Sequence, residues 1–141
     1  MARPDTKLAD LGRTWLFSSL SRKELASVGK RADEVTVPAG KVLTAEGKPG
    51  HEFFLILDGQ AVVSRGGRDI AHLGSGQYFG ELSLLDRGPR SATVTATTPM
   101  TLLVLGQREF SAMLDEVPGL AHKLLAAMAA KLRESWAVTF G

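Results

Sequence analysis

The rhythm of glycines between residues 34 and 106 constrains the fold more than any other feature of this chain. Short apolar runs rich in Val, Ile, Leu, Phe and Thr alternate there with glycine-containing turns. Runs of this length match β-strands, and no helical period separates them, so a parallel α/β sheet is not expected. The runs are residues 34–37, 41–44, 53–57, 61–64, 69–73, 92–96 and 101–105. The pattern predicts a mainly β fold, an antiparallel β-roll or jelly roll with flanking helices.

Helical patterns flank these strands. Ser21 and Glu24 have the spacing of a capping box and predict a short amphipathic helix over about 22–32. After Gly106, apolar residues again recur at three and four positions, in two stretches separated by Pro118 and Gly119. The second stretch, 120–136, has an apolar face wide enough to cover the sheet and also meet a partner. The predicted organisation is a flexible N-terminus over 1–12 and one domain over 13–141, with the roll at about 34–106 and closing helices at about 107–138.

Length, charge and cysteine usage exclude several classes of protein. A chain of 141 residues allows one domain, and 44% hydrophobic with 23% charged residues is ordinary globular usage. Without cysteine there is no disulfide framework, thiolate zinc site or cysteine nucleophile. A net charge of +2 is too small to indicate a protein that binds nucleic acid. The longest apolar run, 124–130, is far short of the about 20 residues of a membrane span, and no secretion signal is recognised. We expect a cytoplasmic protein that binds neither nucleic acid nor membrane.

Residues 79–94 contain the candidate ligand-binding residues of the sequence. Gly80 allows a close backbone approach, and the half-turn after it has free N–H groups that can face an anion. Glu81 and Arg90 lie nine residues apart on the two arms of this excursion, with the Ser91 hydroxyl beside the arginine. Arginine grips a phosphate through parallel hydrogen bonds, and an ionised glutamate accepts from a sugar hydroxyl. The stretch therefore suits a ligand with one phosphate and a nearby hydroxyl.

Phe-Gly-Glu-Leu-Ser-Leu at 79–84 and Pro-Arg-Ser-Ala-Thr-Val at 89–94 resemble the phosphate-binding cassette of cyclic nucleotide-binding domains. This family includes the regulatory subunits of protein kinase A and the bacterial catabolite activator proteins. The nine-residue spacing matches the kinase type, and the resemblance extends from about Leu16 to Trp136. It implies a non-catalytic sensor of a cyclic nucleotide, with no cofactor and no metal.

The resemblance also implies a role for each matching residue. Arg90 would bind the exocyclic phosphate oxygens with help from Ser91, and Glu81 would accept the ribose 2′-hydroxyl or, alternatively, only cap the turn. Adjacent backbone would line the same cradle, at Gly80, Leu82 and Ala92. Val63 and Ile70 would form an apolar wall for sugar and base. On the last helix, Ser135 would contact the adenine edge and Trp136 would stack on the base, although Trp136 is also a candidate for packing or a partner contact.

The residue after the arginine bears on the choice of nucleotide. Some cGMP-preferring members of the family carry Thr there and strict cAMP sites often carry Ala, whereas catabolite activators carry Ser and take cAMP. Ser91 therefore favours cAMP over cGMP.

Two other function classes are alternatives to the sensor. A metal-dependent β-roll enzyme would gather several histidines on neighbouring strands. His51, His72 and His122 lie instead in a predicted turn, strand and helix, so neither a metal site nor a catalytic residue is predicted. A protein-interaction module whose cassette has lost its ligand, or takes a different one, is the remaining alternative.

The resemblance suggests a mechanism for the sensor. The two C-terminal helices would move about a hinge at Pro118 and Gly119 when ligand binds. No output domain follows within the 141 residues. We therefore expect either a separate partner or a larger protein of which this is the regulatory part, and the helix over 120–136 is the candidate surface for a partner or for self-association.

Overall fold

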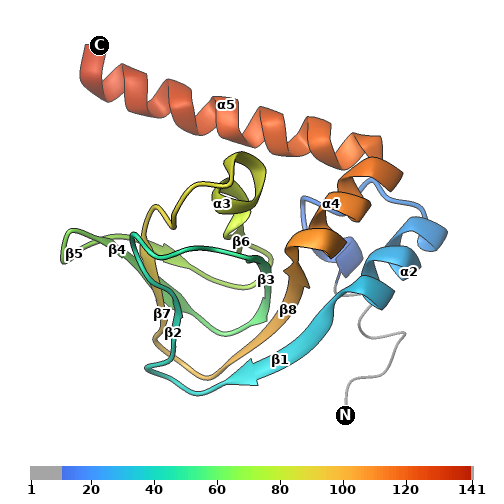
Figure 1. Ribbon diagram of the computed structural model, residues 1–141, viewed down its shortest axis with the longest axis horizontal. Helices are drawn as coiled ribbons and strands as arrows, with labels where there is room; N and C mark the ends of the chain where they lie inside the picture. The colour runs from blue at the N-terminus through green and yellow to red at the C-terminus, as the bar shows by residue number, and fades with distance from the viewer. Residues whose placement is uncertain (1–10, 141) are drawn as a thin grey trace.

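The computed structural model describes the backbone of residues 11–140 and the side chains of residues 11–134. Within that part, eight strands form two four-stranded antiparallel sheets (Figure 1). One sheet has the order β1-β8-β3-β6 and the other β2-β7-β4-β5. The strands are β1 (Asp33–Val37), β2 (Val42–Thr44), β3 (Glu52–Asp58), β4 (Ala61–Arg65), β5 (Arg68–Leu73), β6 (Tyr78–Phe79), β7 (Thr93–Ala96) and β8 (Met100–Gly106). The predicted antiparallel β-roll is confirmed.

Strand β3 explains why the most apolar run of the chain shows no alternation of polar and apolar residues. Successive side chains of a strand point to opposite faces. Phe53 and Leu55 pack among the helices, whereas Phe54 and Ile56 pack between the two sheets. Because both faces of β3 are covered, all four side chains are at most 5% exposed. The strand therefore lies between the two halves of the core and holds them together.

The helices lie on one side of the roll, as Figure 1 shows. Their bounds are α2 (Arg22–Arg31), α3 (Glu81–Asp86), α4 (Gln107–Glu116) and α5 (Pro118–Phe140). The predicted capping box of α2 is confirmed, because the Glu24 N–H donates to Ser21 Oγ at 3.1 Å and the Ser21 N–H donates to Glu24 Oε1 at 2.8 Å. Only Val117 separates α4 from α5, where the sequence predicts an interruption at Pro118 and Gly119.

Two sequence-based expectations need correction. Strand β6 was not predicted, because two residues are too few for any alternation to register. Leu11, assigned to the flexible segment 1–12, is 1% exposed and belongs to the core with Leu16 and Phe17. The packed chain therefore reaches at least to Leu11, and residues 1–10 lie outside the described part.

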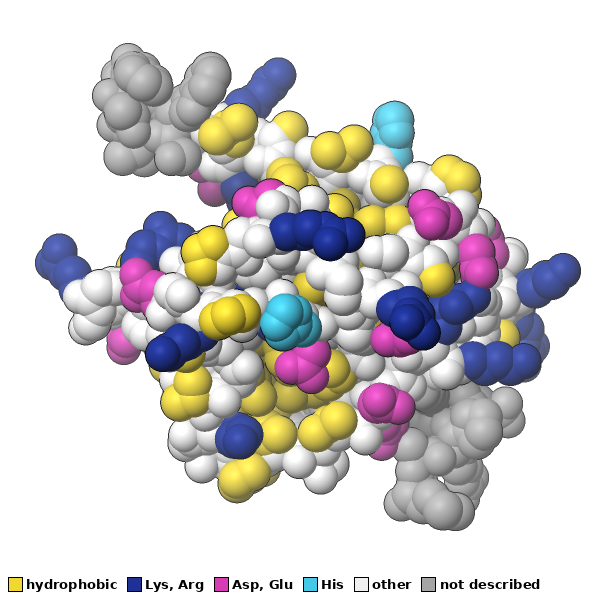
Figure 2. Space-filling model, in the orientation of Figure 1, with side chains coloured by type: hydrophobic (Ala, Val, Ile, Leu, Met, Phe, Trp, Pro, Cys, Tyr) yellow, Lys and Arg dark blue, Asp and Glu magenta, His cyan; other side chains and the backbone are white. Residues whose placement is uncertain are grey.

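Helix α5 buries only the start of its apolar face. Leu120 and Leu124 are at most 2% exposed and join the helical side of the core. Leu125 and Leu132 are 62% and 54% exposed. Figure 2 shows hydrophobic side chains along the outer surface of this helix. The helix therefore offers apolar surface that the rest of the described chain does not cover.

Candidate functional site

The site begins at the turn between β6 and α3. Gly80 has φ 94°, a left-handed conformation that side chains disfavour. A Cβ at this position would lie 2.7 Å from the Glu52 carbonyl oxygen and 3.0 Å from Arg90 Nη1. Glycine is therefore required twice, for the backbone angle and for the close approach of β3 and Arg90. The turn directs the first residues of α3 toward the sheet β2-β7-β4-β5.

Arg90 is held in place by its backbone and by its side chain. Its N–H donates to the Lys48 carbonyl at 2.8 Å, and its own carbonyl accepts from the Gly47 N–H at 2.9 Å. The guanidinium donates through Nη1 to the Gly80 carbonyl at 3.1 Å and through Nη2 to the Glu52 carbonyl at 2.9 Å. These bonds fix a side chain that is only 6% exposed.

The electrostatic setting of Arg90 leaves its charge in place. Burial lowers the pKa of the guanidinium, and the nearby carboxylates of Glu52 and Glu81 oppose that shift. An arginine remains protonated in proteins, so a buried positive charge stands at this point. Two of its five N–H donors are used by the backbone carbonyls, which leaves three for a ligand.

Glu81, the first residue of α3, is 9% exposed. Burial raises the pKa of its carboxyl. The backbone N–H groups of Glu81 and Leu82 and the charges of Lys131 and Arg90 oppose that rise. The same carboxylate contributes, after burial, to the raised pKa of the Tyr78 hydroxyl. The site therefore holds a carboxyl whose charged form is only partly compensated.

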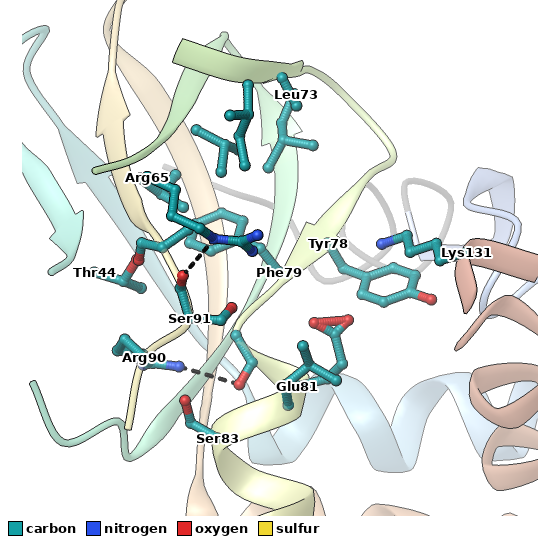
Figure 3. A pocket seen from close by; sticks show the side chains of 17 residues that line it. Thr44, Arg65, Leu73, Tyr78, Phe79, Glu81, Ser83, Arg90, Ser91 and Lys131 are labelled. Atoms are coloured by element: carbon teal, nitrogen blue, oxygen red, sulfur yellow. Dashed lines mark hydrogen bonds between the residues drawn. The ribbon is translucent and has the colours of Figure 1, made fainter. Parts of the chain in front are cut away.

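One cavity of about 340 Å³ joins these groups (Figure 3). Arg90 and Ser91 lie on one side, and Tyr78, Glu81 and Lys131 lie on another. Its apolar lining comes mainly from the β4-β5 hairpin and from β6 and β7. That lining consists of Val63, Ile70, Ala71, Leu73, Phe79, Ala92 and Val94. A concave, largely apolar space with a few converging polar groups is the usual form of a small-molecule site.

The cavity collects the predicted site residues whose side chains are described. These are Val63, Ile70, Gly80, Glu81, Leu82, Arg90, Ser91 and Ala92. Ser135 and Trp136 lie on α5, but their side chains fall outside the described residues, so their predicted contacts with the base stay predictions. Two donors of the Arg90 guanidinium bind backbone carbonyls, and the predicted hydrogen bonds from this side chain to a phosphate stay a prediction.

Sequence reasoning missed five polar residues of the lining: Thr44, Arg65, Tyr78, Ser83 and Lys131. Ser83 lies inside the cassette itself and is 3% exposed. Arg65 is two residues after Val63 on the same strand, so strand periodicity places both on one face. Lys131 is four residues before Ser135, about one helical turn. These spacings are visible in the sequence, but only the fold shows that the residues line the same cavity.

The described part of the chain contains neither a metal site nor a membrane-spanning helix. Among the residues that the structure describes, no group of three His, Asp or Glu side chains is arranged to hold a metal ion. Over the same part of the chain, no helix has the length and apolar character to span a bilayer.

The comparison with known families now defines the class of protein. Residues 34–117 match the family described as "Cyclic nucleotide-binding domain". This match covers more than half of the 141 residues, so the chain belongs to the cyclic nucleotide-binding domain family.

Individual relatives come from both kinases and bacterial regulators. A "Cyclic AMP receptor protein" of Thermus thermophilus is 35% identical over 125 residues, covering 85% of this chain and 58% of the relative. A "cAMP-dependent protein kinase regulatory subunit" of Eremothecium gossypii is 40% identical over 103 residues, covering 72% and 22%. The cAMP complex of the regulatory domain of Toxoplasma gondii PKA superposes with a TM-score of 0.71 at 32% identity, covering 78% and 44%. The chain thus spans about a quarter to three fifths of the length of the curated relatives it matches.

Proposed function

We propose that this protein binds a cyclic nucleotide in the cavity beneath α5, prefers cAMP to cGMP, and acts in the cytoplasm as a non-catalytic regulatory module. The observation that carries the proposal is the pair of buried, oppositely charged side chains, Arg90 and Glu81, in the lining of one cavity. A guanidinium and a carboxylate on one cavity match the two polar features of a cyclic nucleotide, its phosphate and its 2′-hydroxyl.

Each part of the ligand has a matching part of the cavity. The phosphate would lie at Arg90, where three N–H donors are left, with the Ser91 hydroxyl and the Ala92 N–H beside it. The 2′-hydroxyl would donate to Glu81. The base would lie against Val63 and Ile70 on the hairpin. Relatives named for cAMP, such as the Thermus thermophilus receptor, support cAMP as the ligand, as does Ser91 in the position after the arginine.

Titration calorimetry with cAMP and cGMP tests the proposal. Charge-assisted hydrogen bonds contribute about 1.5–3 kcal/mol each, so Arg90→Ala is expected to weaken cAMP binding at least tenfold. Arg90→Lys retains the charge without the paired donors and is expected to bind with intermediate affinity. Arg108→Ala is a matched control, because Arg108 is exposed on α4 and outside the cavity. Wild-type protein that binds neither nucleotide would refute the proposal.

The proposed signal passes through α4 and α5. Ligand can shift their arrangement only if it binds one arrangement more tightly than another. Lys131 of α5 lines the cavity, so a bound ligand would contact this helix directly. Amide hydrogen exchange across residues 107–140, with and without cAMP, tests this step. We expect cAMP to slow exchange in α5 and around Val117. Equal exchange in both states would refute the movement while leaving binding intact.

A second candidate, an interaction module with no nucleotide ligand, is favoured by one observation. The Arg90 guanidinium donates to the Gly80 and Glu52 carbonyls without any ligand, so two of its donors keep their partners in an empty cavity. Thermal melting separates the two candidates. A specific ligand raises the melting temperature by mass action, by an amount that grows with ligand concentration. An unchanged melting temperature in millimolar cAMP would favour the interaction module.

A further inference from the structure

A second arginine points into the cavity, from the side on which Arg90 and Ser91 lie. Arg65 is the last residue of β4 and belongs to the cavity lining. Figure 3 shows its guanidinium directed toward the middle of the cavity. Neither the sequence motif nor the proposed function gives this residue a role.

Arg65 is anchored in a way that leaves most of its donors available. Its Nε donates to the Ser91 carbonyl at 3.0 Å. That bond uses one of five N–H donors and leaves the four on Nη1 and Nη2. No carboxylate within residues 11–134 lies at ion-pair distance from it. The neighbouring carboxylate of Glu46 accepts instead from the Gly66 N–H at 3.0 Å.

The anchor places Arg65 next to the phosphate end of the cavity rather than the base end. Ser91 follows Arg90 directly in the chain, so the Nε bond sets the two guanidinium groups on either side of one residue. The apolar wall that suits a base lies further along the hairpin, at Ile70 and Leu73. An anion between the two arginines would therefore meet donors from both.

The charge of the cavity lining also favours an anionic ligand. Its described side chains include three cations, Arg65, Arg90 and Lys131, and one carboxylate, Glu81. Like charges on one small cavity repel each other unless a counter-charge lies between them. A monoanionic ligand would relieve this repulsion, and a phosphate offers several acceptors to a planar guanidinium.

We infer that Arg65 is a second cationic contact for the phosphate of the bound nucleotide. This inference rests on the proposed function. It assigns to Arg65 an interaction of its own, in addition to that of Arg90, and makes the strength of phosphate binding depend on the β4-β5 hairpin as well as on the cassette.

Calorimetry on Arg65→Ala tests the inference, with Arg68→Ala as the matched control. Arg68 pairs with Arg65 across the hairpin, is also exposed and does not line the cavity, so both variants remove the same charge from nearly the same place. We expect Arg65→Ala to bind cAMP at least about tenfold more weakly than wild type, and Arg68→Ala to stay within about twofold. Arg65→Lys should fall between them, because it retains the charge but not the fork of donors.

Salt dependence identifies which part of the nucleotide Arg65 touches. An interaction with the phosphate is screened by salt, so the loss of affinity between about 50 and 300 mM salt should be smaller in Arg65→Ala than in wild type or Arg68→Ala. A weaker Arg65→Ala with the salt dependence of wild type would overturn the phosphate assignment. Equal affinities of Arg65→Ala and Arg68→Ala would overturn any specific contact. If wild type binds neither cAMP nor cGMP, the proposed function itself fails, which is a distinct result.

Discussion

At the scale of single residues, Arg90 depends on glycines that are distant from it in sequence. Gly50, in the loop before β3, has no side chain and packs directly on the guanidinium. A Cβ at this position would lie 2.3 Å from Arg90 Nε and 2.5 Å from Cζ. Unlike Gly80, Gly50 has a backbone angle that other residues tolerate. The three nearest atoms that a Cβ would meet all belong to Arg90, so this side chain is what restricts the position.

Gly50→Ala is expected to displace the Arg90 side chain and weaken cAMP binding at least about tenfold, because the donors would leave their place in the cavity. Calorimetry measures the affinity, and circular dichroism shows whether the protein stays folded. Gly74→Ala is the control, since a Cβ there would meet only the Gly59 carbonyl oxygen, at 3.9 Å, and Gly74 does not line the cavity. Wild-type affinity in folded Gly50→Ala would contradict the dependence of Arg90 on this glycine.

The raised pKa of Glu81 predicts a pH dependence of stability in the absence of ligand. Burial favours the neutral carboxyl in the folded state. The stability from this group is therefore fully present below its ordinary pKa of 4.5 and is lost as pH rises through the raised folded pKa. Glu81→Gln lacks this titration.

The melting temperature of wild type, relative to Glu81→Gln, should therefore fall between about pH 4 and pH 7. At neutral pH the Gln variant should be the more stable protein without ligand, and should gain less from added cAMP. Melting curves across this range measure both effects. Parallel curves for the two proteins would show that the buried carboxylate is fully compensated in the folded state.

At the scale of elements, α2 supports the core from outside the site. Both bonds of its capping box are present, and Val28 buries its side chain in the helical half of the core. Ser21→Ala removes an acceptor for an N–H of the first turn and is expected to destabilise the protein by about 1 kcal/mol. Urea denaturation measures this change, with Ser75→Ala in an exposed turn as the control. Because α2 does not line the cavity, cAMP affinity should stay unchanged, and a loss of affinity would contradict that separation.

The sequence predicts the elements well where one physical pattern acts alone. The capping box marks the start of α2, and the glycine turns mark the ends of the strands. Strand β6 was missed because its two residues are set by pairing with β3 and not by their own pattern. Leu11 was missed because its burial depends on packing against residues that are distant in sequence, such as Phe110 and Leu120 of the same core cluster.

The candidate site divides in the same way. Residues 79–94 are local in sequence, so their motif identified the cradle around Glu81 and Arg90. Arg65 and Lys131 reach the cavity from β4 and α5, and only the packing of those elements onto the roll brings them there. The motif therefore predicted the part of the candidate site that residues 79–94 build, and the family resemblance added Val63 and Ile70. Arg65 and Lys131 were found only from the structure.

At the scale of the whole molecule, α5 connects the cavity to the outside. Lys131 faces the cavity, whereas Leu125 and Leu132 lie on exposed surface. These leucines are seven residues apart, two helical turns, so they share one face of the helix. Exposed large apolar side chains in such a row are typical of a contact surface. The same helix can thus sense the ligand on one side and meet a second protein on the other.

We expect this face to mediate self-association, because helices with leucines at a seven-residue spacing pack against one another through that seam. Sedimentation should then give wild type a mass above the 15.1 kDa of one chain, and Leu125→Glu with Leu132→Glu should return it to that mass. Since neither leucine lines the cavity, the double variant should still be stabilised by cAMP, which serves as the control for folding. A wild type that sediments as a single chain at all concentrations would contradict self-association.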